Sequence, residues 1–284
     1  MSWSVIGFEQ QKKYAEQLLK QGELPHAFVF SGPEMIGKKL FAQDLYRLAN
    51  HCETLRDTDP DFTLIAPRVQ DGETKIYIDD IRRARGALSL TPVRGPYKFL
   101  VIDDADRLTV EASNALLKIL EEPPPFSALI LVTSQPRLLL PTIASRCEHL
   151  RFLPHAEEAV KAVLASGTVP KEDLEFILIM AQGKIGWAVR MLEPEKLAEA
   201  RRAVGDFQRI LKKGIAERML FAKNITERDD LRESIALWIA WARAALHRGM
   251  LGHRTVAELV RLGYIVSQPQ YNHRLALEDF LLNV

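Results

Sequence analysis

The chain of 284 residues is 47% hydrophobic and 26% charged, a composition typical of a globular protein with about two domains, or three small ones. Its 38 basic and 37 acidic residues leave a formal net charge of +1, which excludes a global field that attracts nucleic acid. The sequence has only two cysteines, Cys52 and Cys147, which predicts no zinc site and a cytoplasmic location. It also lacks a long apolar run, which predicts no signal peptide and no membrane span.

Strand and helix patterns alternate in the first half of the chain. Short apolar runs predict five strands, over residues 27–30, 62–65, 98–102, 128–132 and 149–152. Helical patterns lie between them, over residues 38–50, 79–88 and 110–122. Strands that alternate with helices indicate a parallel sheet covered by helices on both faces, which is an α/β fold.

The pattern becomes helical after Pro154 and stays so to the last residues. We expect helices over residues 156–165, 171–181, 186–192, 195–212, 214–223, 227–248, 254–268 and 271–282. The predicted fold class is therefore α/β followed by all-α, with a break between two helical parts near Pro194. Trp238 and Trp241 lie in an Ala-rich stretch, which we expect to pack inside a helical bundle rather than to bind a cofactor.

A glycine-rich loop after the first strand matches most of a phosphate-binding motif. Gly32, Gly37 and Lys38 satisfy the pattern G-x-x-x-x-G-K, and the loop follows a strand and opens a helix, as the motif requires. Backbone N–H groups of such a loop cradle phosphate oxygens, and the lysine neutralises them. The next residue should be Ser or Thr, whose hydroxyl binds Mg²⁺, but it is Lys39. Because a lysine cannot ligate the metal, we expect weak metal–nucleotide binding or weak hydrolysis.

Acidic residues follow the third predicted strand. Asp103 ends that apolar run, in the position of a carboxylate that orients the Mg²⁺ shell. Asp104 stands where active enzymes usually carry a Glu that polarises water, and a catalytic group misplaced by about 1 Å can lose about a hundredfold in rate. Asp106 is a candidate N-cap for the helix that follows.

Several further segments resemble the AAA+ clamp-loader subunits of bacteria. Besides the loop, the resemblance is carried by residues 6–7, 26–28, 30–33, 103–109, 114–124, 139–147, 272 and 274–278. It covers essentially the whole chain and is closest to the delta-prime group of the DNA polymerase III clamp loader. The resemblance implies an AAA+ phosphate-loop domain over residues 1–153, a helical lid over 154–196 and a helical collar for oligomerisation over 197–284.

The resemblance also assigns roles to individual positions. ATP-hydrolysing gamma/tau members carry Thr or Ser where this chain has Lys39, and the family's lid carries an Arg where this chain has Gly186. With Asp104, three catalytic positions are altered, which implies a subunit that does not turn over nucleotide. Thr133 and Ser134 match the family's first sensor, although hydroxyls there are equally expected to satisfy a strand end.

One catalytic feature of the family is retained in this sequence, as far as the resemblance implies. Ser145, Arg146 and Cys147 match the segment that presents an arginine finger to a neighbouring subunit. An arginine supplied in trans can raise the rate of phosphoryl transfer by about 10³–10⁵, and its planar guanidinium suits phosphate oxygens better than a lysine would. Without the family context, the same residues indicate an arginine at a helix end that bonds a local carboxylate.

The resemblance implies a stator subunit of the DNA polymerase III holoenzyme, which completes a neighbour's ATP site while the sliding clamp is loaded onto primed DNA. The implied partners are the gamma/tau and delta subunits and, through the complex, the sliding clamp and primer–template DNA. For cofactors, the altered loop predicts at most weak binding of ATP or ADP. No zinc is expected, because the interval 50–61 holds only Cys52 and lacks the family's four-cysteine module. Two alternatives stay open: a weakly active ATPase subunit of a divergent loader, and an adaptor that binds nucleotide without turnover.

Overall fold

The chain folds into two compact units, Met1–Ala159 and Val160–Val284. The structure is a computed structural model that describes residues 2–56, 58–70, 72–165, 169–228, 230–268 and 270–284. The boundary between the units falls within helix α6 (Glu157–Leu164), a few residues beyond the predicted boundary at 153. The further division of the second unit into lid and collar stays a prediction.

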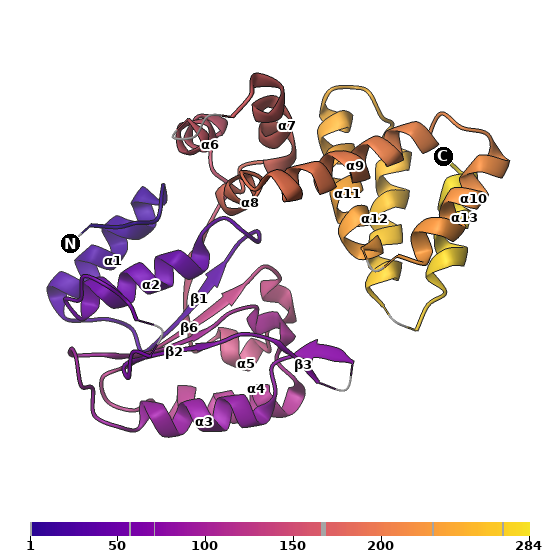
Figure 1. Ribbon diagram of the computed structural model, residues 1–284. Helices are drawn as coiled ribbons and strands as arrows, with labels where there is room; N and C mark the ends of the chain where they lie inside the picture. Colours follow the sequence, from indigo (N-terminus) through magenta and orange to yellow (C-terminus); the bar gives the residue numbers. More distant parts are fainter. Residues whose placement is uncertain (1, 57, 71, 166–168, 229, 269) are drawn as a thin grey trace. The chain divides into compact units, whose positions relative to one another are not determined.

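The first unit is a parallel sheet with helices (Figure 1). Its elements are α1 (Glu9–Gln21), β1 (Ala27–Ser31), α2 (Lys38–Ala49), β2 (Phe62–Ile65), β3 (Arg68–Gln70), β4 (Glu73–Lys75), α3 (Ile78–Leu88), β5 (Lys98–Ile102), the 3-10 turn η1 (Ala105–Arg107), α4 (Val110–Glu121), β6 (Ser127–Thr133), the 3-10 turn η2 (Pro136–Leu138), α5 (Pro141–Ala144) and β7 (Glu148–Arg151). The five-stranded sheet has the order β2-β5-β6-β1-β7, and all its pairs are parallel. The predicted α/β class and its five strands are confirmed.

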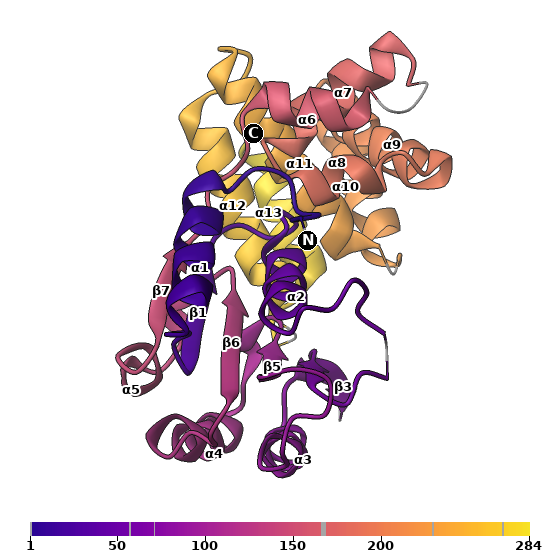
Figure 2. The same cartoon turned by 90° about the vertical axis from the view of Figure 1, so that its left-hand side faces the viewer.

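Strand residues alternate between two apolar layers. Ala27 and Val29 of β1 pack with α3 and α4, whereas Phe28 and Phe30 pack with α1 and α2. Because successive strand side chains point to opposite faces, helices on both faces bury residues 27–30 of β1, and the sequence is continuously apolar there. Figure 1 shows the two helix layers, and Figure 2 shows β7, β1, β6 and β5 side by side in the sheet.

The second unit is helical throughout its described part, which confirms the predicted all-α second half. Its remaining helices are α7 (Lys171–Ala181), α8 (Ile185–Arg190), α9 (Pro194–Ile210), α10 (Ile215–Thr226), α11 (Leu231–His247), α12 (His253–Ser267) and α13 (His273–Leu282). One apolar cluster joins α6, α7 and α8 with Ala200 of α9, and a larger one joins α9 to α13. Trp238 is fully buried in the larger cluster and stacks on Phe207 with ring centroids 4.8 Å apart. The expected role of Trp238 in bundle packing is confirmed, whereas Trp241 is only partly buried.

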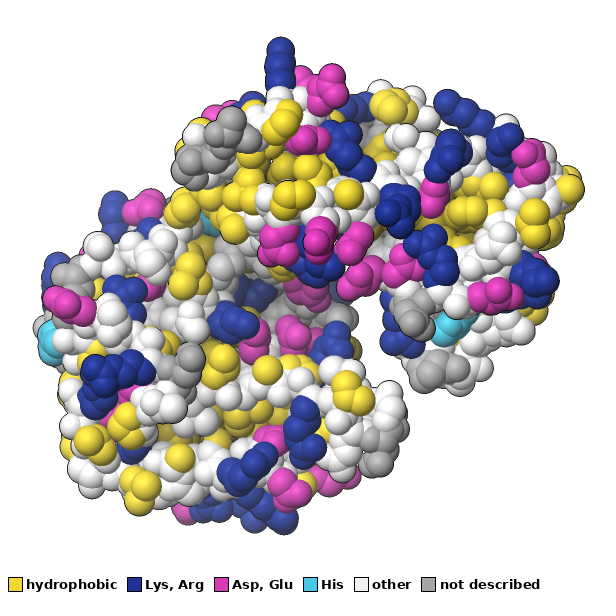
Figure 3. All heavy atoms as spheres, viewed as in Figure 1, with side chains coloured by type: hydrophobic (Ala, Val, Ile, Leu, Met, Phe, Trp, Pro, Cys, Tyr) yellow, Lys and Arg dark blue, Asp and Glu magenta, His cyan; other side chains and the backbone are white. Residues whose placement is uncertain are grey.

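Charged side chains of both signs share the surface. Basic and acidic groups are interspersed over the face in Figure 3, as the net charge of +1 suggests. Within the described ranges, no helix is long and apolar enough to cross a membrane.

Candidate functional site

The candidate site lies where three neighbouring strands end. β1 leads into the glycine-rich loop, β5 ends directly before Asp103, and β6 ends at Thr133. Ser31 pairs with Thr133, and Ile102 with Leu131. Since these strands are parallel, their carboxyl ends share one edge of the sheet, the usual place for a ligand in such folds. The structure thus brings together the loop, the acidic residues and the sensor-like hydroxyls.

Two glycines set the path of the loop. Gly32 has φ +149° and Gly37 has φ +110°, backbone conformations that residues with a side chain rarely adopt. A Cβ atom on Gly32 would lie 2.2 Å from the carbonyl oxygen of Phe152, which follows β7. Gly37 occupies the N-cap position of α2. Gly32 therefore has a packing role of its own, whether or not a phosphate binds.

Lys38 turns back onto the loop. Its side-chain ammonium donates to the carbonyl oxygens of Gly32 at 2.7 Å and Pro33 at 2.6 Å. The residue is 5% exposed, and burial lowers the pKa of Lys38 against the opposing effect of nearby carboxylates, led by Glu34 and Asp103. The loop's own carbonyls thus occupy the ammonium that a phosphate would need.

Lys39 occupies the place of the metal ligand and pairs with Asp103. Its Nζ atom lies 2.9 Å from Oδ2 of Asp103, and the two side chains are 49% and 20% exposed. Mg²⁺ requires oxygen ligands in a near-octahedral arrangement. Here an ammonium replaces one such ligand and neutralises another, so these residues do not fit a bound Mg²⁺.

Asp104 and Asp106 also have partners within the chain. Asp104 has a left-handed backbone with φ 48°, and its carboxylate lies 4.0 Å from Arg107. Partial burial raises the pKa of Asp104, and the Asp103 carboxylate raises it further. The expected N-cap role of Asp106 is wrong: Asp106 lies within the turn η1, and Thr109 caps α4 by accepting from the N–H of Ala112 at 3.2 Å.

The sensor-like hydroxyls have partners within the chain. Thr133 is fully buried. Its Oγ1 donates to Asp106 at 2.5 Å and accepts from the N–H of Gln135 at 2.9 Å. Ser134 donates to Glu34 at 3.3 Å. These bonds satisfy the end of β6, one of the two roles considered for these residues.

Arg146 and the glycine-rich loop lie at opposite ends of the parallel strands. It follows α5 and precedes β7, so it sits at the amino end of a strand whose neighbour β1 carries the loop at its carboxyl end. Its guanidinium donates to the carbonyl of Thr142 at 2.9 Å and to Glu121 at 3.2 Å, and the side chain is 39% exposed. An arginine at this edge cannot reach its own loop, so any phosphate that it binds must come from another molecule.

The remaining predicted positions lie next to Arg146 and in α8. Ser145 donates to the carbonyl of Thr142 at 3.2 Å. Cys147 is half-buried, and burial raises its thiol pKa to about 12, so it stays protonated at neutral pH. Gly186 lies in the first turn of α8. In the described part of the chain, no group of three or more His, Cys, Asp or Glu could hold a metal ion.

Two partners of the site were not identified from the sequence, although a carboxylate partner was one of the two roles considered for Arg146. Glu121 holds Arg146, and Glu34 holds Ser134. Glu121 lies within the family-like segment 114–124, but no local signal links the end of α4 to the turn after α5. Such pairs depend on the tertiary packing of segments that are far apart in the sequence.

Known proteins resemble most of the chain. A family model described as DNA polymerase III, delta subunit, matches residues 7–156. The gamma/tau subunit of DNA polymerase III from Mycobacterium tuberculosis is 32% identical over 173 residues, which are 57% of this chain and 30% of that protein. The delta-prime subunit from Bacillus subtilis is 30% identical over 220 residues, which are 72% of this chain and 65% of that protein. The chain thus spans less than a third of the mycobacterial gamma/tau relatives and about two thirds of the delta-prime subunit from Bacillus subtilis.

A solved structure shares the fold. A gamma subunit-related protein from Thermotoga maritima has a TM-score of 0.59 at 22% identity, covering 95% of this chain and 97% of that one. At this identity the likeness concerns the fold alone. It agrees with the expected arrangement of a parallel sheet domain followed by helices.

Proposed function

This chain belongs to the DNA polymerase III delta-subunit family of clamp-loader proteins, and from that membership we propose that it is a stator subunit without ATP hydrolysis of its own. The observation that carries the proposal is the ion pair between Lys39 and Asp103, at 2.9 Å. Lys39 stands where a hydroxyl would bind Mg²⁺, and its ion pair neutralises the carboxylate that Mg²⁺ also needs during phosphoryl transfer. The bonds from Lys38 to the carbonyls of Gly32 and Pro33 support the same conclusion.

In this proposal, Arg146 acts on a neighbouring subunit. Its position at the amino end of β7 supports action in trans, and its exposed guanidinium can exchange Glu121 for the γ-phosphate of a bound ATP. There it would stabilise the charge that spreads over the phosphate oxygens in the transition state. The ion pair with Glu121 is solvent-exposed and costs little to break, about 0–1 kcal/mol.

In this proposal the chain is also one subunit of a larger assembly. Residues 154–196 would form the lid and residues 197–284 the collar, through which the chain joins gamma/tau and delta subunits. The apolar cluster shared by α9 to α13 supports packing of the proposed collar helices with one another. The complex would open the sliding clamp and place it on primer–template DNA.

The deciding experiment is DNA-stimulated ATP hydrolysis by the reconstituted loader, with the motor and clamp-opening subunits of the same genome. Arg146→Ala should lower the rate by about tenfold or more, while size-exclusion chromatography still shows the assembled complex. Arg151→Ala is the matched control, because Arg151 is also exposed but ends β7 at the opposite edge of the sheet. An unchanged rate with Arg146→Ala would remove the finger assignment.

A second arm separates the competing functions. The isolated chain should show no ATP hydrolysis. Hydrolysis that Asp103→Asn abolishes would instead identify a weakly active ATPase. Nucleotide affinity without hydrolysis would identify a nucleotide-binding adaptor.

A further inference from the structure

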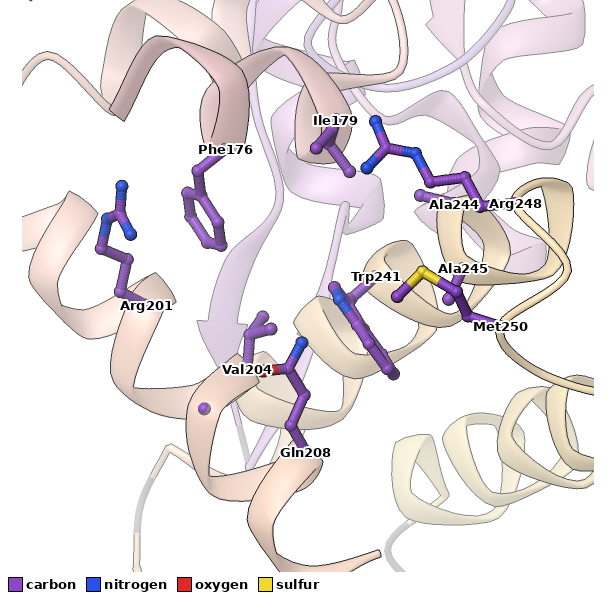
Figure 4. Close-up of a pocket in the computed structure, with 11 residues that line it drawn as sticks. Phe176, Ile179, Arg201, Val204, Gln208, Trp241, Ala244, Ala245, Arg248 and Met250 are labelled. Atoms are coloured by element: carbon purple, nitrogen blue, oxygen red, sulfur yellow. The ribbon is translucent and has the colours of Figure 1, made fainter. Parts of the chain in front are cut away.

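The second unit contains a small cavity that the proposed function does not use. Its volume is about 190 Å³, and side chains of α7, α9, α11 and the turn after α11 line it (Figure 4). Phe176, Val204, Trp241 and Met250 are among its apolar lining residues. Sites for small molecules and cofactors usually measure about 300–1,000 Å³. This cavity is smaller, so it suits one inserted side chain better than a cofactor.

Trp241 is the rigid wall of the cavity. Its ring packs edge-on against Phe207 of the helical core, with centroids 5.9 Å apart and planes at 84°, and the residue also lines the cavity. The indole N–H of Trp238 donates to the carbonyl of Ala203 at 2.8 Å, whereas none of the described residues pairs with the indole N–H of Trp241. A fixed aromatic ring with a free donor is a common anchor at protein interfaces.

The charged groups around the cavity are basic, and one is unpaired. Arg201 is already engaged, because it donates to Asp173 at 2.5 Å and to the carbonyl of Glu172 at 3.0 Å. Arg248 is exposed and forms no ion pair with any residue that the structure describes. No acidic side chain lines the cavity. The free guanidinium of Arg248 therefore calls for a carboxylate from outside, which it could bind through two parallel hydrogen bonds.

Gly205 keeps the cavity open. It lies inside α9, where glycine is less stable than alanine. Its φ is not left-handed, and a Cβ atom built on it meets nothing within 4 Å, so neither the backbone nor close packing requires glycine. Because Gly205 lines the cavity, a larger residue there would fill it.

We propose that this cavity is the docking site for a short peptide segment of a partner protein. The peptide inserts one bulky apolar side chain against Trp241 and places a neighbouring carboxylate on Arg248. The volume fits the apolar anchor, the unpaired guanidinium fits the carboxylate, and Gly205 leaves the space that the anchor needs.

A random peptide library displayed on phage, selected against the full chain, tests the proposal. The enriched peptides should carry Phe, Trp, Leu or Ile beside Asp or Glu. A fluorescein-labelled copy of the strongest peptide, followed by fluorescence anisotropy, should bind Arg248→Glu and Gly205→Leu at least tenfold more weakly. Gly205→Leu matters most, because it fills the cavity without removing a contact and its stability can be checked by thermal unfolding.

Two control variants make the test specific. Arg243→Glu reverses a charge on an exposed position of α11 that does not line the cavity, and Gly86→Leu makes the same glycine change in the open interior of α3. Both should bind the peptide like the unchanged chain. Selection of peptides without an acidic residue, no enrichment at all, or equal weakening by the controls would overturn the proposal. So would self-association of the chain that Arg248→Glu abolishes, because a second copy would then be the occupant.

Discussion

The ammonium of Lys39 and the carboxylate of Asp103 lie 2.9 Å apart, and this ion pair joins the first turn of α2 to the carboxyl end of β5. Two positions that would share a metal ion in an active phosphate loop are thus joined directly. Both side chains are partly exposed, so the pair itself contributes only about 0–1 kcal/mol to stability. The block on metal binding therefore arises from the identity of residue 39, and a single substitution should relieve it.

The first prediction concerns that substitution. Lys39→Thr should raise the affinity for ATP by at least tenfold in the presence of Mg²⁺, because it supplies the missing hydroxyl and frees Asp103 to orient the metal shell. The measurement is a titration of a fluorescent ATP analogue with the isolated chain, with Mg²⁺ and again with a chelator. The gain should vanish with the chelator.

Two variants separate the causes of that gain. Lys39→Met removes the charge but supplies no metal ligand, so it should not give Mg²⁺-dependent binding. Adding Asp103→Asn to Lys39→Thr should remove most of the gain. If Lys39→Thr binds ATP no better than the unchanged chain, then the bonds from Lys38 to Gly32 and Pro33, and not Lys39, keep the site closed.

A second prediction tests the geometry that Arg146 needs. Arg146→Lys keeps the charge but loses the planar fork that binds two phosphate oxygens, so the reconstituted loader should lose about tenfold in ATP hydrolysis, much as with Arg146→Ala. Glu121→Gln removes the charged partner of Arg146 and should leave the rate unchanged or raise it. A full rate with Arg146→Lys would mean that a positive charge alone is enough, which contradicts a finger.

The sheet and the edge that carries the candidate site were predictable from the sequence. β5 spans the predicted residues 98–102, because a strand buried on both faces is marked by its own continuous apolar run. The shared edge of Ser31, Asp103 and Thr133 then follows from parallel pairing. The partners of individual side chains do not follow, since the contact of Lys39 with Asp103 depends on how α2 sits over β5.

Other elements lacked a local signal. Helix α1 begins after Phe8, whose side chain gives no cap, and buries only Ala15 completely, so neither a start signal nor a wide apolar stripe marks it. The strands of the β3–β4 hairpin have three residues each and are mostly exposed, which is too short for an alternating pattern. Asp106 does not cap α4, because it lies within η1, and Thr109 directly precedes the helix and supplies the cap.

The third prediction separates packing from nucleotide binding in the loop. Gly32→Ala should destabilise the chain by on the order of 3 kcal/mol, because its φ of +149° is strained for a side chain and the new Cβ would meet the Phe152 carbonyl at 2.2 Å. The measurement is urea unfolding without nucleotide. Gly22→Ala is the control: its φ is also positive, +71°, but nothing lies within 4 Å of the added atom. Equal losses would mean that backbone strain alone acts at Gly32.

The last prediction concerns a buried carboxylate far from the loop. Asp61 accepts the N–H groups of Val93 at 2.8 Å and Arg94 at 2.6 Å, and its side chain lies 3.0 Å from the ammonium of Lys98. Burial alone would raise the pKa of Asp61, but these partners, led by the Arg94 N–H, lower it overall. Asp61→Asn keeps the shape but leaves Lys98, 4% exposed, as an unpaired buried cation, which typically costs about 3–5 kcal/mol.

The pH dependence of that loss follows from the sign of the shift. Because the folded pKa of Asp61 lies below the unfolded value of about 3.9, the ionised form stabilises the fold above that pH, and the contribution is lost as the pH falls through the folded pKa. The difference in unfolding free energy between the unchanged chain and Asp61→Asn should therefore be constant from pH 5 to 7 and narrow below about pH 4. Urea unfolding at several pH values measures it, with Asp79→Asn, 72% exposed, as the control. Adding Lys98→Met to Asp61→Asn should recover part of the loss, because removing both charges leaves no unpaired ion. No recovery, or a difference that does not depend on pH, would show that the hydrogen bonds from Val93 and Arg94 dominate the effect and that the charge of Asp61 does not.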